Sequence, residues 1–290
     1  MNGTNSTQLY YPYGLAFDSS NALYIADSSN NRVQKLITGT KTCITVAGQA
    51  NGTSGNSSVD LYEPADILLN TNNDIYITDR GNDRIQFWPN GATSAVTFAG
   101  SGSFPYIAYN YSTAIVNDPI SGKIYLANTR THRIISNPAG VVLAGGNGAG
   151  NSYTQLNSPY GLAYDSFSKS FVIPNSATNN IVRWVISATN RTHITGDING
   201  NFGATSTTLN CPIGLILDPM GNIYVADSNN HRIQMFLANQ SNATTIAGVT
   251  GVSGTNSTYL NTPYWLILDN QLNLYVSDTF NHRVQKFLRC

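Results

Sequence analysis

The chain has 290 residues, of which only 10% are charged, against about 25% in an ordinary soluble domain. Its 15 basic and 15 acidic residues leave a net charge of zero, so no long-range field gathers phosphate groups, and composition argues against nucleic acid as a partner. No apolar run approaches the roughly 20 residues needed to cross a bilayer, and we expect no direct membrane insertion.

Two strands and a polar turn form a unit that recurs along the chain. In its clearest copy, the runs 223–226 and 233–236 are rich in β-branched and aromatic residues and flank the turn residues 227–231, which predicts a β-hairpin. The six copies begin at Tyr24, Tyr76, Tyr125, Val172, Tyr224 and Tyr275. A period of about 50 residues with strands and no helix is typical of a β-propeller.

Two further strands flank each hairpin. A preceding strand occupies residues 12–18, 64–69, 113–118, 159–165, 212–218 and 263–269, and all but the third begin with proline. A fourth strand ending in glycine follows five hairpins, at residues 44–48, 96–100, 141–145, 193–196 and 245–248. We therefore predict an all-β, six-bladed β-propeller with four antiparallel strands per blade, whose last blade lacks its own fourth strand. We expect one domain, residues 1–290, with blades near 9–60, 61–105, 106–155, 156–208, 209–259 and 260–290.

The repeated residues resemble those of NHL repeats over essentially the whole chain. The likeness rests on the Pro-x-Gly-apolar start of the first strand, Tyr-Val-Ala-Asp in the second, Asn-His-Arg-Ile-Gln across the turn and the closing Ala-Gly. The fourth blade departs most, with Pro174, Asn175 and Asn180 in place of Ala, Asp and Arg. This resemblance implies an NHL-type propeller, whose family includes RNA binders, extracellular adhesion modules, kinase sensor domains and peptide-amidating lyases.

An acidic residue precedes an arginine by five positions across the turn of several hairpins. The pairs are Asp27 and Arg32, Asp79 and Arg84, Asp227 and Arg232, and Asp278 and Arg283. Each pair spans its own turn, and the fourth blade loses both members together, as a structural pair would. We therefore interpret the pairs as structural and predict no catalytic residues, since the nucleophile-elbow, zinc-helix and phosphate-loop motifs are also missing from the sequence.

Three histidines, His132, His231 and His282, directly precede the arginine position of blades 3, 5 and 6. Zinc needs ligands about 2 Å from one point, whereas turns of non-adjacent blades lie far apart, so we expect no metal site and no cofactor. The three cysteines, Cys43, Cys211 and Cys290, have no metal-like spacing, and the sequence leaves their pairing open.

Tyrosines follow the opening proline of three blades, at the expected rim of the central channel. They are Tyr13, Tyr160 and Tyr264. Two interpretations stand at this point. The rings pack between blades, as most aromatic side chains at strand ends do, or they stack on a sugar or peptide ligand with an apolar face and a polar tip.

Candidate glycosylation sites occur throughout the chain as Asn-x-Ser/Thr sequons. They are Asn2, Asn5, Asn51, Asn56, Asn110, Asn190, Asn239, Asn242 and Asn256. All of them fall in predicted loops, and none interrupts the first three strands of a blade. Each is sterically usable if the chain enters a eukaryotic secretory pathway.

The third strand of the last blade is predicted to have an open edge. Residues 1–8 are too polar to form the missing strand and resemble the loop 254–258, so we disfavour closure by this segment. Three outcomes stay open: the edge is bare, the full-length protein supplies the strand, or a neighbouring molecule donates one. The last of these gives head-to-tail assembly, which runs on as a filament if it does not close.

The function that we expect is that of a non-enzymatic, extracellular or secreted NHL propeller. It serves as an interaction or structural module for a protein or glycan partner, or for itself through the edge of blade 6. Two alternatives are a metal-dependent lyase resembling the peptide-amidating lyases and the ligand-sensing ectodomain of a larger receptor. The predicted inner strands offer no histidine for a lyase metal, and 15 Lys plus Arg are few for an RNA-binding face.

Overall fold

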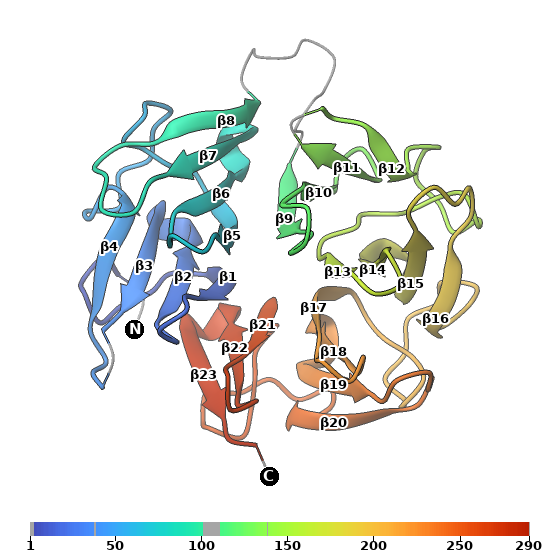
Figure 1. Cartoon of the computed structure of the whole chain (residues 1–290). Helices are drawn as coiled ribbons and strands as arrows, with labels where there is room; N and C mark the ends of the chain where they lie inside the picture. The colour runs from blue at the N-terminus through green and yellow to red at the C-terminus, as the bar shows by residue number, and fades with distance from the viewer. Residues whose placement is uncertain (1–2, 38, 101–110, 138, 290) are drawn as a thin grey trace. The chain divides into compact units, whose positions relative to one another are not determined.

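The computed structural model, which describes residues 3–37, 39–100, 111–137 and 139–289, contains six antiparallel sheets (Figure 1). Blade 1 contains β1 (Pro12–Phe17), β2 (Leu23–Asp27), β3 (Arg32–Leu36) and β4 (Cys43–Gly48), and blade 2 contains β5 (Pro64–Leu69), β6 (Ile75–Asp79), β7 (Arg84–Trp88) and β8 (Val96–Gly100). Blade 3 contains β9 (Ser112–Asn117), β10 (Ile124–Asn128), β11 (Arg133–Asn137) and β12 (Val142–Gly145), and blade 4 contains β13 (Ala163–Asp165), β14 (Ser170–Asn175), β15 (Asn180–Val185) and β16 (Thr192–Gly196). Blade 5 contains β17 (Pro212–Leu217), β18 (Ile223–Asp227), β19 (Arg232–Phe236) and β20 (Ala243–Gly248), and blade 6 contains β21 (Trp265–Leu268), β22 (Leu274–Asp278) and β23 (Arg283–Phe287).

The predicted fold class is confirmed: the chain is an all-β, six-bladed propeller. In each sheet the strands follow one another in chain order, and the described residues give the last blade three strands. Two first strands are shorter than predicted, since β13 begins at Ala163 rather than at residue 159 and β21 begins at Trp265 rather than at residue 263. The reason is visible in β1, where the ladder is interrupted between Pro12 and Leu15, so the Pro-x-Gly segment departs from regular pairing.

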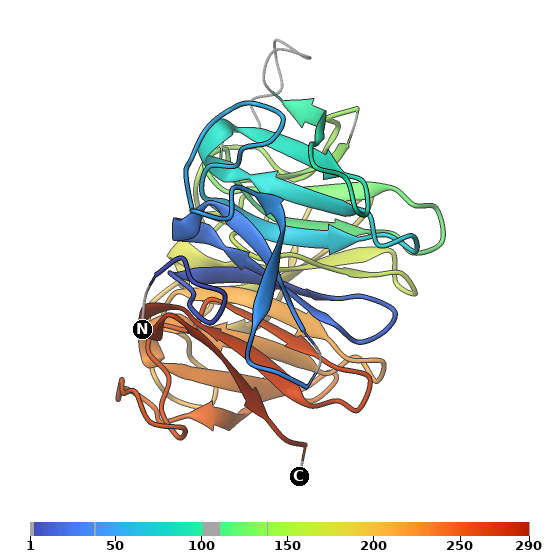
Figure 2. The ribbon, with the colours of Figure 1, turned by 90° about the vertical axis from the view of Figure 1, so that its left-hand side faces the viewer.

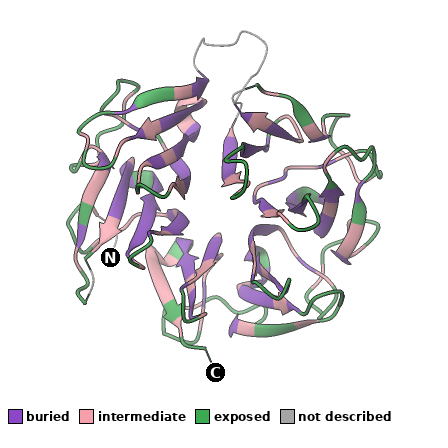
Figure 3. Cartoon of the chain, in the orientation of Figure 1, coloured by how far each residue is buried: buried purple, intermediate pink, exposed green. Residues whose placement is uncertain are grey.

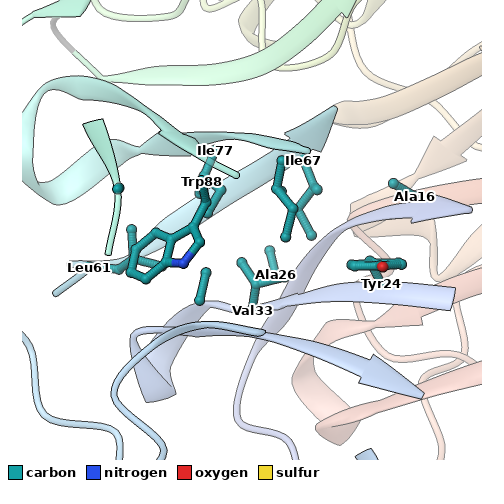
Figure 4. Close-up of a cluster of buried hydrophobic side chains, with 11 residues drawn as sticks. Ala16, Tyr24, Ala26, Val33, Leu61, Ile67, Ile77 and Trp88 are labelled. Atoms are coloured by element: carbon teal, nitrogen blue, oxygen red, sulfur yellow. The ribbon is translucent and has the colours of Figure 1, made fainter. Parts of the chain in front are cut away.

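The chain divides into two compact units, residues 1–115 with 267–290 and residues 116–266. In the first unit, buried side chains of blades 1 and 2 form one cluster, in which Val33 packs with Leu61 and Trp88 (Figure 4). In the second unit, Val172 of blade 4 and Phe236 of blade 5 belong to a corresponding cluster. The second strands are buried almost throughout, whereas the fourth strands carry much of the exposed surface (Figure 3).

The turn between the second and third strand has the same conformation in five of the blades. In blade 1 it is a 3₁₀ helix, η1 (Ser28–Asn30), followed by Asn31 in the left-handed conformation at φ 53°. The other four are η2 (Arg80–Asn82), η3 (Ser176–Thr178), η4 (Ser228–Asn230) and η5 (Thr279–Asn281). The left-handed position holds Asn31, Asp83, His132, Asn179, His231 and His282. Asn, Asp and His adopt this conformation several-fold more often than other non-glycine residues, which explains the choice of side chain.

The start of the chain contacts blade 1 rather than blade 6. Asn30 Nδ2 donates to Gly3 O at 2.7 Å, and the Cys43 amide donates to Ser6 O at 2.7 Å. Residues 3–8 form no strand, as predicted, so within the described part of the chain β23 pairs with β22 alone. The red strands of blade 6 near the C-terminus are seen from a second side in Figure 2. Among the described residues, no helix is long and apolar enough to span a membrane.

Candidate functional site

Each left-handed turn residue holds the start of a neighbouring blade. Their side-chain acceptors bind backbone amides: Asn31 Oδ1 accepts from Glu63 N (3.0 Å), Asp83 Oδ1 from Tyr111 N (2.9 Å), His132 Nδ1 from Ser158 N (3.0 Å), Asn179 Oδ1 from Cys211 N (2.9 Å), His231 Nδ1 from Thr262 N (3.1 Å) and His282 Nδ1 from Tyr11 N (3.3 Å). The histidine trio therefore has a structural role, because Nδ1 accepts only without a proton. Burial lowers the pKa of His132 and His282, which favours this neutral form.

The Asp–Arg pairs are buried and tie each turn to its neighbouring loops. In blade 5, Arg232 Nε lies 2.8 Å from Asp227 Oδ2, and the other carboxylate oxygen accepts from the Asn210 amide at 2.7 Å. The guanidinium also donates to the carbonyls of Ala204 and Thr205, at 3.0 and 2.8 Å. Burial raises the pKa of Asp227, while the hydrogen bonds and the arginine oppose that effect. These atoms are fully engaged within the fold, which supports the structural interpretation of the pairs.

A second set of contacts joins the residue directly after the second strand to a neighbouring blade. Four hydroxyl groups donate to the carbonyl of the next first-strand proline: Thr129 to Pro159 (2.8 Å), Ser176 to Pro212, Ser228 to Pro263 (2.6 Å) and Thr279 to Pro12 (2.8 Å). Blade 2 has Arg80 at this position, and β9, the first strand of blade 3, begins without proline.

The Arg80 side chain lies between two tyrosines. Its guanidinium carbon is 4.8 Å from the centre of the Tyr13 ring and 4.6 Å from that of Tyr111, and Nη2 is 3.0 Å from Glu63 Oε2. The guanidinium is almost completely buried. Tyr13 also packs against the core cluster of blades 1 and 2. Of the three predicted rim tyrosines, this one is therefore committed to packing and to a cation–π contact.

Tyr160 and Tyr264 are both half-buried, and both lie in the second unit of the chain. They immediately follow the opening prolines of their blades, outside the strands β13 and β21. Neither tyrosine lines the cleft described below.

The sequon asparagines of the described segments lie outside the strands and are exposed to solvent. They are Asn5, Asn51, Asn56, Asn190, Asn239, Asn242 and Asn256. Asn2 and Asn110 lie outside the described residues. The seven described asparagines are therefore accessible to a modifying enzyme. Their placement in loops was predicted from the sequence alone.

A cleft of about 560 Å³ lies between the first hairpins of blades 4 and 5. Its polar lining includes Asp165, Arg183 and Asp218, and Arg183 Nη1 lies 2.8 Å from Asp165 Oδ2. Its apolar lining includes Phe167 and Met220, whose side chains are 99% and 78% exposed. The lining thus combines exposed apolar side chains with charged groups, and ligand sites commonly join apolar surface to a few polar groups.

The two apolar rim residues occupy equivalent positions in their blades. In every blade, the amide two residues after the turn Asp or Asn donates to that side chain: Ser20 to Asp18, Asn72 to Asn70, Ile120 to Asp118, Phe167 to Asp165, Met220 to Asp218 and Gln271 to Asp269. Blades 3, 4 and 5 thus carry a large apolar side chain at this tip, and Ile120 is 85% exposed. We call Ile120, Phe167 and Met220 the apolar tips. Blades 1, 2 and 6 carry Ser, Asn and Gln there.

Comparison with known proteins adds family evidence to this geometry. The family model "NHL repeat" matches residues 9–36 and 209–236, which contain the first three strands of blades 1 and 5. Blades 1 and 5 therefore contain NHL repeats. The chain is 39% identical over 98 residues to human NHL repeat-containing protein 2, a match that spans 31% of this chain and only 13% of that relative.

Solved structures share the fold of this chain at low sequence identity. An auxiliary nutrient binding protein from Bacteroides thetaiotaomicron is 16% identical with a TM-score of 0.71, covering 96% of this chain and 69% of that one. The virginiamycin B lyase from Staphylococcus aureus is 12% identical with a TM-score of 0.60, covering 100% of this chain and 87% of the lyase. Such distant likenesses show the fold alone.

Sequence reasoning identified the Asp–Arg pairs of the NHL blades but missed the apolar tips and the acceptor role of the histidines. A signal for the acceptors was present, because the residue before the arginine position is always Asn, Asp or His. The tips had a weaker signal, an isolated large apolar residue two positions after Asp in a polar turn. Among the described residues, no three His, Cys, Asp or Glu side chains gather closely enough to hold a metal ion.

Proposed function

We propose that this NHL propeller is a non-catalytic, extracellular binding module that engages a protein partner through the cleft of blades 4 and 5. The observation that carries the proposal is the placement of the apolar tips. Phe167 and Met220 stand almost fully in solvent on turns that three other blades build from polar residues. Exposed large apolar groups gathered at one site are typical of protein interaction surfaces.

The charged lining of the cleft suits a protein partner. Asp165 and Arg183 are each about a quarter exposed and are paired with each other, so both can also meet a group of the partner at the rim of the interface. A partner that covers Phe167 would shield the ion pair from solvent and strengthen its electrostatic interaction. Tyr164 adds an aromatic wall, and its ring lies 5.1 Å from that of Tyr125 in blade 3.

The extracellular setting is part of the same proposal. The described sequon asparagines are all exposed, and the chain has few charged residues to maintain its solubility. N-linked glycans on the loops supply hydration that charges supply in other proteins. The Bacteroides relative in fold is named as a nutrient binding protein, which is consistent with a binding role.

The test compares partner capture by two matched variants. The double variant Phe167→Asn with Met220→Asn copies the polar tip of blade 2, and the control Ile44→Asn with Val96→Asn removes exposed apolar groups from outer strands. Tagged proteins are cross-linked in extracellular fluid of the native source, and bound proteins are quantified by mass spectrometry. We expect the tip variant to lose at least one partner about tenfold, while the control retains it.

Equal recovery by wild type and tip variant would refute the cleft as the binding site.

Metal analysis of the purified chain tests the rival lyase function. A tightly held transition metal in one-to-one ratio would count against a non-catalytic module.

A further inference from the structure

The turn Asp of the first hairpin pairs with a cation in blades 1, 4 and 6. The cation lies on the third strand, three residues after the first residue of that strand, and we call this the cation position. The pairs, with the distance from Oδ2 to the cationic nitrogen, are Asp18 with Lys35 (2.9 Å), Asp165 with Arg183 (2.8 Å) and Asp269 with Lys286 (3.5 Å).

In blades 1 and 6 a tyrosine of the second strand takes part in the same contact. The lysine nitrogen lies 4.9 Å from the ring centre of Tyr24 in blade 1 and 5.0 Å from that of Tyr275 in blade 6. A carboxylate and an aromatic ring thus bind one ammonium group together in both blades.

Blade 5 keeps the acid and the tyrosine but has no cation at the cation position. Tyr224 Oη lies 3.3 Å from Asp218 Oδ2. Met235 occupies the cation position and is paired with Tyr224 across the sheet. Blade 1 has the same register between Lys35 and Tyr24. Among the described residues, no lysine or arginine forms an ion pair with Asp218.

Neutral groups bind the Asp218 carboxylate without balancing its charge. Oδ1 accepts from the amides of Met220 and Asn222, both at 2.9 Å, and Oδ2 accepts from Asn222 Nδ2 at 2.8 Å. In blade 6, Asp269 accepts the same three hydrogen bonds and has Lys286 as well. The two carboxylates therefore differ chiefly in the ammonium group, which blade 6 supplies and blade 5 does not.

Asp218 lines the cleft between blades 4 and 5, so a molecule bound there can supply the cation. The charged residues of the lining are Asp165, Arg183 and Asp218, two negative and one positive, which gives a net charge of −1. Arg183 is paired with Asp165, so the unbalanced charge is that of Asp218. Phe167 and Met220 line the same cleft, and such apolar side chains pack well on a hydrocarbon stem.

The tyrosine favours lysine over arginine as the missing cation. Blade 4 uses an arginine, and it has Val172 at the tyrosine position. Blades 1 and 6 have tyrosine there and use lysine. Blade 5 has Tyr224 and so matches the lysine blades.

We infer that the cleft binds a lysine side chain of the protein partner, with its ammonium group on Asp218 and its hydrocarbon stem against the apolar tips Phe167 and Met220. The inference rests on the proposed function, because it names the chemistry of the partner at the same cleft. Lys35 and Lys286 show the geometry within this chain, in which the ammonium meets one carboxylate oxygen and lies over the neighbouring ring.

Methionine methyl groups report on this site directly. The chain has three methionines, of which Met220 lines the cleft and Met235 is paired with Tyr224. In protein with ¹³C-labelled methionine methyl groups, we expect Nα-acetyl-lysine amide to shift the signals of Met220 and Met235 saturably at millimolar concentration. The same probe acetylated at Nε has no charge and should leave both signals in place.

Two matched variants separate loss of charge from loss of fold. Asp218→Asn copies blade 2, where Asn70 Oδ1 accepts from the amides of Asn72 and Asp74 at 2.9 Å, so the turn should keep its geometry. We expect about tenfold weaker probe binding by this variant. The control is Asp118→Asn in blade 3, where the acid is half-exposed and is not part of the cleft lining, and it should bind the probe like wild type.

Partner capture tests whether the lysine belongs to a protein. Met235→Lys supplies the cation from within the chain, as blades 1 and 6 do, and should lower recovery of the partner about tenfold. Acetylating the lysines of the extracellular fluid proteins before capture should have the same effect. Recovery that is undiminished by acetylation would overturn a protein lysine as the ligand.

Two results with the probe would also overturn the inference. They are equal shifts with the charged and the acetylated probe, and unchanged affinity in Asp218→Asn. Partner capture separates this failure from failure of the proposed function. A partner lost by the tip variant but retained by Asp218→Asn would keep the cleft as the binding site and reject the lysine contact, whereas a partner retained by both variants would reject the cleft itself.

Discussion

Nδ1 of His231 in blade 5 lies 3.1 Å from the backbone nitrogen of Thr262, the residue before the first proline of blade 6. The imidazole accepts a backbone hydrogen bond here, as the Asn31 side chain does between blades 1 and 2. One side-chain acceptor in a left-handed turn thus positions the entry of the next blade. The acceptor belongs to a short turn, but its hydrogen bond joins residues about 30 positions apart in the sequence.

Removing the acceptor should destabilise the fold without affecting the cleft. We expect His231→Leu to lower the free energy of unfolding by about 1–3 kcal/mol, because the Thr262 amide loses its partner. His231→Asn, which copies blade 1, should cost much less. Urea denaturation of both variants measures the difference, and equal midpoints for Leu and Asn would contradict the acceptor role.

Acidification should weaken the same contacts. Burial lowers the pKa of His132 and His282, so their contribution to stability is fully present above the unfolded pKa near 6.5 and is lost as pH falls below it. We expect the urea midpoint to fall between pH 7.5 and pH 5. The double variant His132→Asn with His282→Asn should flatten that part of the pH profile, and an unchanged slope would argue against it.

A second, more acidic transition should arise from Asp18 in the first hairpin. Burial alone would raise its pKa, but hydrogen bonds from Ser20, Lys35 and the Ala22 amide lower it to about 2. Its contribution is present above the unfolded pKa near 4 and is lost as pH falls toward 2. We expect Asp18→Asn to be less stable than wild type at pH 6 but equally stable at pH 2. Thermal unfolding at both values tests this.

Breaking a turn pair should be costly because both partners are buried. Asp227→Ala leaves the Arg232 charge buried beside its carbonyl acceptors, and we expect a loss of about 3–5 kcal/mol. The double variant Asp227→Asn with Arg232→Asn copies blade 4 and should recover part of that loss. An unchanged melting temperature for Asp227→Ala would show that the pair is energetically idle.

Glycan occupancy is directly measurable at the exposed sequons. We expect glycopeptide mass spectrometry of native protein to find N-linked glycan at several of Asn51, Asn56, Asn190 and Asn239. Unmodified peptides at all four positions would refute the extracellular part of the proposed function.

The fold could be predicted from the sequence because the repeat marks where each strand begins and ends. Proline, Asp, Arg and Gly recur at fixed spacing, and the strands follow from that spacing. Blade 4 keeps the same spacing without Asp or Arg, because Asn175 and Asn180 occupy the two turn positions between apolar strands.

The candidate site was harder to predict, because surface function depends on which turns lie side by side. Phe167 and Met220 are 53 positions apart, and nothing local to either residue reveals that both line one cleft. The role of His282 was equally hidden, since its acceptor contact reaches residue 11. Spacing within one repeat fixes strands, whereas contacts between repeats need the three-dimensional arrangement.

That last contact has a consequence for the topology of the chain. His282 joins blade 6 to Tyr11 with the same kind of bond that His231 makes between two consecutive blades, and Thr279 repeats on Pro12 what Ser228 does on Pro263. The junction between blades 6 and 1 is therefore held by non-covalent interactions equivalent to those at a junction crossed by the polypeptide. Because side-chain contacts of the same kind hold both junctions, we expect the fold to tolerate a circular permutation that moves the chain ends to another junction.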